Sequence, residues 1–318
     1  MREVVIAGIG MTRFGKFLDR GLKSLGQEAV SAALEDAGAQ GTQLQAAYVG
    51  NAVAGLITGQ ETIRGQVVLR AMGIGGLPVF NIDNACAGSS SALHLAWLSV
   101  ASGQYDCVLA LGVEKMTHPD KQRTFTAIAS GLDVEAAEQE AKAHGVAEGA
   151  GKTRSVFMDY YANSILRYME RHGATPLHIA KVSAKNHVHA SLNPYAQYRN
   201  PMTPEEVLAD VPVVQPFTRS MCSPVADGAA AAVVCSAEFA RRLGARTVRI
   251  AATTLRSAEA EGRDEDNVIQ RSADAAYEMA GIGPEDVRVV EVHDAAASAE
   301  MQAYEQLRLC GEGEAHRW

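Results

Sequence analysis

The chain has 318 residues, a formal net charge of −8, 47% hydrophobic residues and 21% charged residues. This length can bury a sizeable core in one or two domains, and the composition is that of an ordinary globular protein. The acidic balance and the lack of any block of lysine and arginine argue against a nucleic-acid-binding protein. No apolar run approaches the roughly 20 residues of a membrane span, and the N-terminus does not read as a signal peptide.

The cysteine pattern bears on the redox environment of the chain. There are five cysteines, an odd number, and they are widely spaced without a Cys-x-x-Cys pair. They are Cys86, Cys107, Cys222, Cys235 and Cys310. This pattern favours reduced thiols over a disulfide framework or a zinc site. We therefore expect a cytoplasmic α/β enzyme, and we expect no metal site.

Apolar runs alternate with helical patterns over the first 112 residues. Strands are predicted over residues 4–10, 46–52, 78–83 and 106–112. Helices are predicted over residues 22–37, 61–72 and 89–102, and Gly38 and Gly103 follow the first and the third as stops. Strands that alternate with helices in this way indicate a mostly parallel sheet that is covered on both faces.

The pattern changes after Met116. Residues 117–215 contain polar helical segments, a Gly/Ala/Glu-rich stretch and the loop NPYAQYRNPMTPEE, which together are typical of a long insertion. Residues 227–244 return to a strand followed by a helix, and a second strand–helix pattern begins at residues 248–255.

An internal repeat links the two ends of the chain. Residues 29–52 align with residues 272–295 at a constant shift of 243, with seven identities in 24 positions. Each copy would be a helix, a glycine stop, a short linker and a strand, which favours a duplication. The second copy stops before its counterpart of the 78–83 strand. We therefore expect an incomplete second half, either because the polypeptide is shortened or because something else covers its edge.

The stretch NIDNACAGSSSALHLA places Cys86 at the corner between a strand and a helix. The amides and the dipole at a helix N-terminus stabilise a thiolate, which is the nucleophilic form of cysteine. The same amides can face an oxyanion, and small neighbours such as Gly88 let a substrate approach closely. The alternative that the residues leave open is a buried structural cysteine.

Four segments, in the right order, resemble the thiolase family, and in particular its sterol-carrier-protein-type members. NACAGSSSALHLA resembles the nucleophile motif, and KNHVHASLNPYAQYR resembles a segment of the loop domain. CSPVADGAAAAVV resembles the segment that closes the first half, and EVHDAAASAEMQAYEQLRLC resembles the EVHDAF-type motif. The resemblance covers essentially the whole chain.

This resemblance implies an α/β thiolase fold with duplicated βαβαβαββ halves, an inserted loop domain and an incomplete second half. The N-terminal half would comprise residues 1–116 and 216–246. The inserted loop domain would be residues 117–215, and the truncated C-terminal half residues 247–318.

The resemblance also implies roles for single residues. Cys86 would be the acylated nucleophile of an acetyl-CoA C-acyltransferase that cleaves or forms 3-ketoacyl-CoA. His293 would help to hold the thioester oxygen, and Asp294 could orient its neighbour. Met158 would form an apolar wall against the pantetheine arm of coenzyme A, and Gly88 would lie at the substrate. Coenzyme A would be a substrate, and no permanently bound cofactor is expected. His293 as a surface residue and Met158 as a packing residue are the alternatives.

Two catalytic elements of the family are not found in the sequence. There is no Gly-His-Pro motif, whose histidine activates the cysteine, and no C-terminal CxG-type or HNGG-like segment. The sequence also reads HDAAA where the motif carries phenylalanine. A general base typically contributes about 10²–10⁴-fold to a rate. The chain is therefore expected to lack the C-terminal part that members of the family carry. The polypeptide would be truncated, or the missing part would be present in another form of the protein, or the chain would be a thiolase-like subunit with a non-catalytic or partner-completed role.

The resemblance and the missing motifs together leave three hypotheses for the function of the chain. The first is a thiolase of lipid metabolism that acts on fatty or sterol-derived 3-ketoacyl-CoA. The second is a thiolase-like retro-aldolase or condensing subunit with a small partner subunit, and the third is a catalytically silent assembly subunit. A homodimer or tetramer is expected from the family and from the exposed edge of a parallel sheet.

Overall fold

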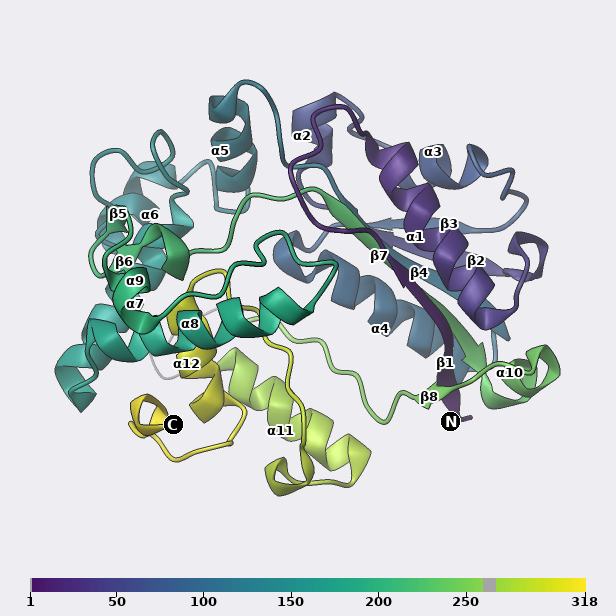
Figure 1. Ribbon diagram of the computed structural model, residues 1–318. Coiled ribbons are helices and arrows are strands. Elements are labelled where there is room, and N and C mark those ends of the chain that lie inside the picture. Colours follow the sequence, from purple (N-terminus) through teal and green to yellow (C-terminus); the bar gives the residue numbers. More distant parts are fainter. Residues whose placement is uncertain (1, 260–266) are drawn as a thin grey trace. The chain divides into compact units, whose positions relative to one another are not determined.

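A computed structural model describes residues 2–259 and 267–318 of the chain (Figure 1). The fold consists of two compact units. The first unit comprises Met1–Ala127 and Val225–Thr253, and the second comprises Ile128–Pro224 and Thr254–Trp318.

The first unit is built around a six-stranded sheet in the order β3-β2-β4-β7-β1-β8. Its strands are β1 (Val4–Met11), β2 (Ala46–Gly50), β3 (Val79–Ile82), β4 (Cys107–Glu114), β7 (Gly228–Ser236) and β8 (Val248–Arg249). Its helices are α1 (Leu22–Ala37), α2 (Ala54–Thr58), α3 (Arg64–Arg70), α4 (Gly88–Ala101), α5 (Lys121–Ala129, whose last two residues count with the second unit) and α10 (Ala237–Leu243). Short 3₁₀ turns occur at η1 (Gly41–Gln43) and η2 (Ala85–Ala87).

The pairing of the strands differs from the predicted, mostly parallel sheet. β2 pairs in parallel with β3 and β4, but β7 is antiparallel to both β4 and β1, and β8 is antiparallel to β1. The prediction was wrong here because a buried apolar run does not record its direction. The return strand β7 enters between β4 and β1 only after the long insertion, and helices within an insertion do not by themselves fix the direction of the strand that follows.

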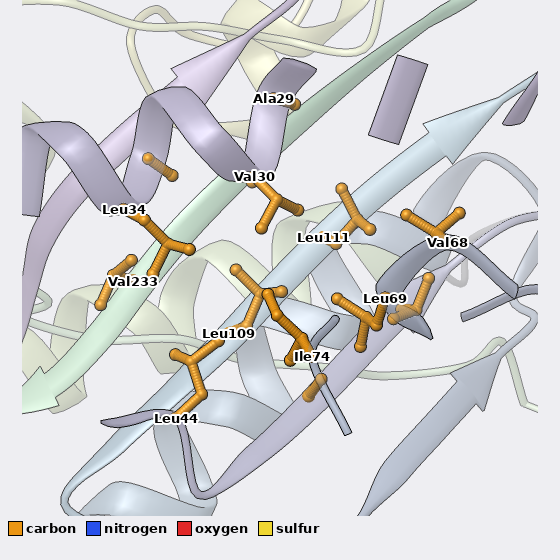
Figure 2. Packing of buried hydrophobic residues seen from close by; sticks show 14 of the residues in the cluster. Ala29, Val30, Leu34, Leu44, Val68, Leu69, Ile74, Leu109, Leu111 and Val233 are labelled. Carbon is orange, nitrogen blue, oxygen red and sulfur yellow. The ribbon is translucent and has the colours of Figure 1, made fainter. Parts of the chain in front are cut away.

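Helices cover both faces of this sheet, as predicted. Alternate residues of each strand point to opposite faces. On one face Leu109 and Leu111 of β4 pack with α1 and α3 (Figure 2), and on the other face Val108 and Ala110 pack with α4. The predicted helix at residues 22–37 coincides with α1, and Gly38 ends it with a left-handed φ of 61° that favours glycine.

The second unit is mainly helical. Its helices are α6 (Ala137–Ala143), α7 (Phe157–His172), α8 (Pro176–Leu192), α9 (Pro204–Leu208), α11 (Val268–Ala280) and α12 (Ala297–Gln306). A small hairpin of β5 (Pro212–Val214) and β6 (Phe217–Thr218) and the turns η3 (Arg219–Met221), η4 (Pro284–Asp286) and η5 (Ala315–Arg317) complete it. Residues from α7, α8, α9, β6 and α12 share one apolar cluster: Ile165, Ile179, Val207, Phe217 and Met301.

The internal repeat is confirmed in its helix and wrong in its strand. α11 ends at Gly281 with a φ of 69°, as α1 ends at Gly38. However, residues 289–295 form no regular strand, and Val289 is 82% exposed. An extended segment becomes a strand only when a neighbouring segment supplies ladder hydrogen bonds. The strand predicted at residues 248–255 is reduced to β8, which joins the first sheet.

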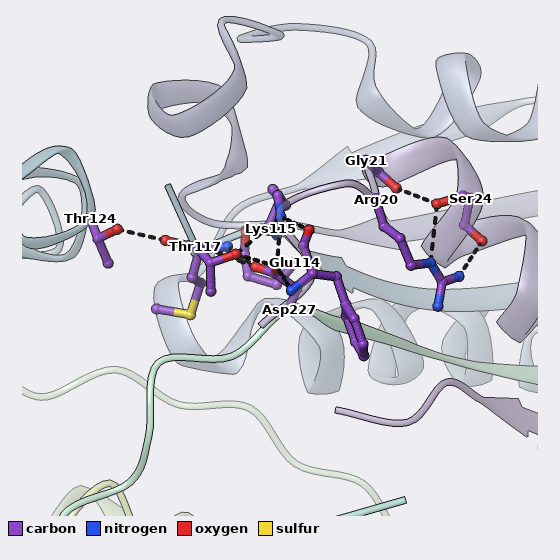
Figure 3. A network of polar contacts seen from close by, with 10 residues as sticks. Arg20, Gly21, Ser24, Glu114, Lys115, Thr117, Thr124 and Asp227 are labelled. Atoms are coloured by element: carbon purple, nitrogen blue, oxygen red, sulfur yellow. Dashed lines mark hydrogen bonds and ion pairs between the residues drawn. The ribbon is translucent and has the colours of Figure 1, made fainter. Parts of the chain in front are cut away.

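A buried ion pair joins the two points where the chain leaves the sheet after β4 and re-enters it before β7. Lys115 follows β4, Asp227 precedes β7, and their Nζ and Oδ2 atoms lie 2.6 Å apart (Figure 3). Asp227 also accepts hydrogen bonds from the backbone N–H groups of Phe17, Met116 and Thr117. Burial alone would raise the pKa of Asp227, but Lys115 and the other donors hold it below its usual value.

Replacing Asp227 by alanine would leave the Lys115 ammonium buried without its carboxylate. We expect the free energy of unfolding to fall by about 3–5 kcal/mol, as measured by urea denaturation at pH 7. Because the folded-state pKa of Asp227 is lowered, the wild-type advantage is present above the unfolded pKa and is lost as the pH falls through the folded one.

The exposed pair of Glu238 and Arg242 on α10 provides the control. Glu238→Ala should cost only about 0.3–0.5 kcal/mol. If the free energy of unfolding fell equally in Asp227→Ala and Glu238→Ala, the result would contradict a stabilising role for the buried ion pair.

Candidate active site

Cys86 lies at the corner between β3 and α4, in the short turn η2, and its side chain is exposed. Helix α4 begins two residues later, at Gly88, and runs for 14 residues. A helix of this length carries a partial positive charge and unsatisfied N–H groups at its start. The alternative of a buried structural cysteine is therefore wrong.

The backbone that presents Cys86 is strained. Ala85, directly before it, has a φ of 43°, in the left-handed region that non-glycine residues rarely adopt. Such a conformation costs about 1–3 kcal/mol and persists only where its surroundings hold it. The Ala87 N–H donates to the Asn84 carbonyl at 2.9 Å, and the Asn84 side chain donates to Ser91 Oγ at 2.8 Å. These bonds fix the turn to the first two turns of α4.

Two glycines let this corner approach the sheet closely. A Cβ atom on Gly50, the last residue of β2, would lie 2.6 Å from the carbonyl carbon and oxygen of Gly88. A Cβ atom on Gly112 in β4 would lie 2.1 Å from Ser89 Oγ. Real Cβ atoms do not make such contacts, so only glycine at both positions leaves room for α4 to begin where it does. Gly88 itself is buried against Gly50.

A carboxylate that the sequence reasoning missed lies at the same edge of the sheet. Glu114 ends β4, and its carboxylate accepts hydrogen bonds from the Asn51 side chain at 3.0 Å and from the Ala52 N–H at 2.9 Å. Burial raises the pKa of Glu114, although backbone N–H donors oppose the shift. A signal was present: Glu114 is a charge at the end of an apolar strand, where the sites of α/β proteins commonly lie.

The other predicted residues belong to the second unit. His293 is exposed and lines a cavity of about 530 Å³ together with Tyr160, Tyr161, Ser164 and Gln302. This cavity combines aromatic and hydrogen-bonding side chains, so its lining can contact both an apolar chain and a polar group.

Asp294 points to a different place from His293. It lines a separate cavity of about 230 Å³ and accepts a hydrogen bond from the Asn186 side chain at 3.2 Å. Burial, and after it the neighbouring Glu300 carboxylate, raises the pKa of Asp294 above its usual value. Met158, at the start of α7, is buried with 8% of its surface exposed.

The structure thus brings Cys86 and Gly88 together in the first unit. It places Met158, His293 and Asp294 in the second unit, where His293 and Asp294 line different cavities. Within the described residues, no group of three or more His, Cys, Asp or Glu side chains could hold a metal ion. Among the helices of residues 2–259 and 267–318, none has both the length and the apolar character of a membrane span.

Comparison with known families identifies the class of protein. The model of the thiolase N-terminal domain matches residues 4–216, and the model described as thiolase C-terminal domain-like matches residues 252–318. The chain therefore belongs to the thiolase family and has the α/β thiolase fold.

Individual relatives agree with this assignment. The benzoylsuccinyl-CoA thiolase subunit BbsB of Thauera aromatica is 38% identical over 98% of this chain and 77% of its own length. An acetyl-CoA acetyltransferase of Methanocaldococcus jannaschii is 39% identical over 99% of this chain and 78% of its own length. Human sterol carrier protein 2 is 32% identical over 99% of this chain and 58% of its own length.

A solved structure described as an Ltp2-ChsH2(DUF35) aldolase is similar as well. It superposes with a TM-score of 0.76 at 25% identity, covering 99% of this chain and 79% of that one.

Alkylation by iodoacetamide tests the exposure of Cys86. Burial raises the pKa of Cys222 to about 12 and that of Cys310 to about 11, so at pH 8 both remain almost entirely thiols. We expect Cys86 to be modified at least about tenfold faster than either, because it is exposed at a helix N-terminus. Peptide mass spectrometry over time measures the order, and modification of Cys222 or Cys310 first would contradict it.

Glycine variants tie this reactivity to the close approach of α4. Gly50→Ala should displace the first turn of α4 and change the alkylation rate of Cys86 several-fold. Gly75→Ala is the matched control, since a Cβ atom there meets nothing within 4 Å.

Proposed function

We propose that the chain is a thiolase-type acyltransferase and that Cys86 is its nucleophile. The supporting observation is an exposed thiol at the N-terminus of α4. Ala85 before it has a left-handed backbone conformation, and the first turn of α4 packs against Gly50 of β2 and Gly112 of β4. The segmentation into a first half of residues 1–116 and 216–246, a loop domain of residues 117–215 and a second half of residues 247–318 belongs to the same proposal.

In the cleavage direction the Cys86 thiolate adds to the 3-keto carbon of a 3-ketoacyl-CoA. The bond between the α and β carbons then breaks, and the departing enolate of acetyl-CoA takes up a proton equivalent to the one that the thiol released. Coenzyme A next attacks the acyl-cysteine thioester and regenerates the thiol, so that one difficult step becomes two easier ones. The condensation is the reverse of this sequence, and coenzyme A is a substrate throughout.

The remaining site residues receive supporting roles in this proposal. His293 donates a hydrogen bond to the thioester oxygen, from its position at the edge of a large polar and aromatic cavity. Asp294 supports the backbone at His293, Met158 provides apolar surface for the pantetheine arm, and Gly88 leaves space for substrate. We further propose a cytoplasmic location with reduced thiols and a role in lipid metabolism, which the similarity to sterol carrier protein 2 supports.

A second candidate function is a partner-completed subunit with retro-aldolase or assembly activity. The names of two similar proteins favour it, one a thiolase subunit and the other an aldolase that combines two components. The sequence contains no Gly-His-Pro motif, so a base for Cys86 would come from elsewhere in such an assembly.

The Cys86→Ala variant separates the two functions. Under the thiolase proposal the wild-type chain forms an acetyl adduct on Cys86 with acetyl-CoA and thiolyses acetoacetyl-CoA. The variant forms no acetyl adduct, and its thiolysis rate falls by at least about 10³-fold. Intact-mass analysis and loss of the enolate absorbance of acetoacetyl-CoA measure these two quantities.

An unmodified Cys86 and equal rates for the wild type and the variant would contradict the thiolase proposal. Retro-aldol cleavage that survives in Cys86→Ala would support the second candidate function instead. Cys310→Ala is the control for the loss of a cysteine, and it should leave both readouts unchanged.

We also propose a homodimer formed through the edge strand β3. This strand is only partly buried, and its Phe80 is 44% exposed and stacks on Tyr48 with ring centroids 4.9 Å apart. An exposed edge with an aromatic side chain is a surface that proteins usually cover. We expect twice the chain mass in light scattering and the chain mass for Phe80→Glu. A monomeric wild type would contradict the proposal.

A further inference from the structure

A polar cluster of the second unit contains the residue that follows His293. It is formed by Lys185 and Asn186 of α8, Glu300 and Tyr304 of α12, and Asp294. Glu300 is only 5% exposed, although it carries a carboxylate. A carboxylate is buried at such a position only when hydrogen bonds and opposite charge compensate it.

Asn186 connects the two carboxylates of the cluster. Its Nδ2 atom donates to Asp294 Oδ2 at 3.2 Å and to Glu300 Oε2 at 2.5 Å. An amide nitrogen offers two hydrogens, so both donors of Asn186 are used. The other oxygen of Glu300 accepts from the Tyr304 hydroxyl at 2.7 Å and forms an ion pair with Lys185. Glu300 therefore fixes the amide that holds Asp294.

The direction of His293 depends on Asp294, because successive side chains of this segment line different cavities. On the C-terminal side, the Ser223 N–H donates to the Ala295 carbonyl at 3.0 Å, and Ala296 forms a β-bridge with Cys222. On the side of His293, the Asn186 side chain donates a hydrogen bond to Asp294 Oδ2 at 3.2 Å and so restrains the residue next to the imidazole. A rotation of the backbone at Asp294 would turn the imidazole away from its cavity.

We propose that Asn186 and Glu300 are positioning residues, which hold Asp294 and thereby fix the direction of the His293 imidazole for its proposed catalytic role. This inference rests on the proposed function of His293. Neither residue touches the substrate; both act through Asp294. A positioning network of this kind supports a reacting group by restricting it to productive geometry.

The charges of the cluster distinguish this role from a merely structural one. The titratable groups that share the cluster or the cavity with Asp294, or act on its charge, are Glu300, Lys185, Tyr304, His293, His187, Tyr198 and Cys222. The carboxylate of Glu300 raises the pKa of Asp294, whereas a donor such as Asn186 favours its ionised form. Removing the one or the other therefore moves the pKa of Asp294 in opposite directions.

The experiment measures kcat, KM and the pH profile of kcat/KM for acetoacetyl-CoA thiolysis in three variants. Asn186→Leu removes both donors at nearly constant volume. It should lower kcat about 10–100-fold with KM changed less than about threefold, and it should move the acid limb to higher pH. Glu300→Gln keeps the shape and removes the charge, so the acid limb should move to lower pH.

Asn163→Leu is the matched control. Asn163 is an asparagine of α7 whose amide also donates to two acceptors, the carbonyls of His144 and Gly145. It should leave kcat and the acid limb at their wild-type values. Thermal melting checks that each variant is folded, and Glu300→Gln keeps the test decisive if Asn186→Leu does not fold.

The outcomes separate the failure of this inference from that of the proposed function. An active wild type whose acid limb stays in place in both Asn186→Leu and Glu300→Gln overturns the positioning role and leaves the thiolase activity standing. A wild-type chain that neither acetylates Cys86 nor thiolyses the substrate overturns both. Opposite displacements of the acid limb support the inference.

Discussion

The site of the first unit depends on how closely helix α4 approaches the sheet. The first turn of α4 lies directly against the ends of β2 and β4, and only hydrogen atoms at Gly50 and Gly112 leave room for it. Once α4 begins there, the chain leaving β3 must turn within η2, and Ala85 takes up a left-handed conformation to do so. The position of Cys86 thus depends on the close packing of the first turn of α4 against glycines of β2 and β4.

Ionic and polar contacts then keep the surroundings of this corner in place. Glu114 at the end of β4 gathers the backbone N–H groups that follow β2, and Lys115 next to it is paired with Asp227. Glu114 therefore joins the end of β4 to the segment after β2, and Lys115 joins it to the segment before β7. In the second unit the amide of Asn186 has a comparable function, because it joins Asp294 to α12 through Glu300.

Local features of the fold could be predicted from the sequence. Helix α1 and its stop at Gly38 follow from apolar spacing and from the one residue that adopts a left-handed φ without strain. The corner at Cys86 follows from an apolar run that meets a small-residue helix, and the structure places an exposed thiol there. The role of Cys86 as a nucleophile stays a prediction. Family resemblance added the thiolase fold, which the domain matches confirm.

Features that depend on distant partners could not be predicted. The antiparallel entry of β7 and the lack of a regular strand at residues 289–295 are decided by which segments are available for pairing, and a single segment does not contain this information. Asn186 and Glu300 lie more than 100 positions apart and look like ordinary polar residues of two helices. Only their meeting at one buried point distinguishes them.

The ion pair of Lys115 and Asp227 also has a consequence for the segment between its two residues. It holds both ends of this 111-residue segment, residues 116–226, at one place on the sheet. A segment held at its base in this way can lengthen, shorten or diversify in sequence without disturbing the strand register, as loops carried by a rigid scaffold commonly do.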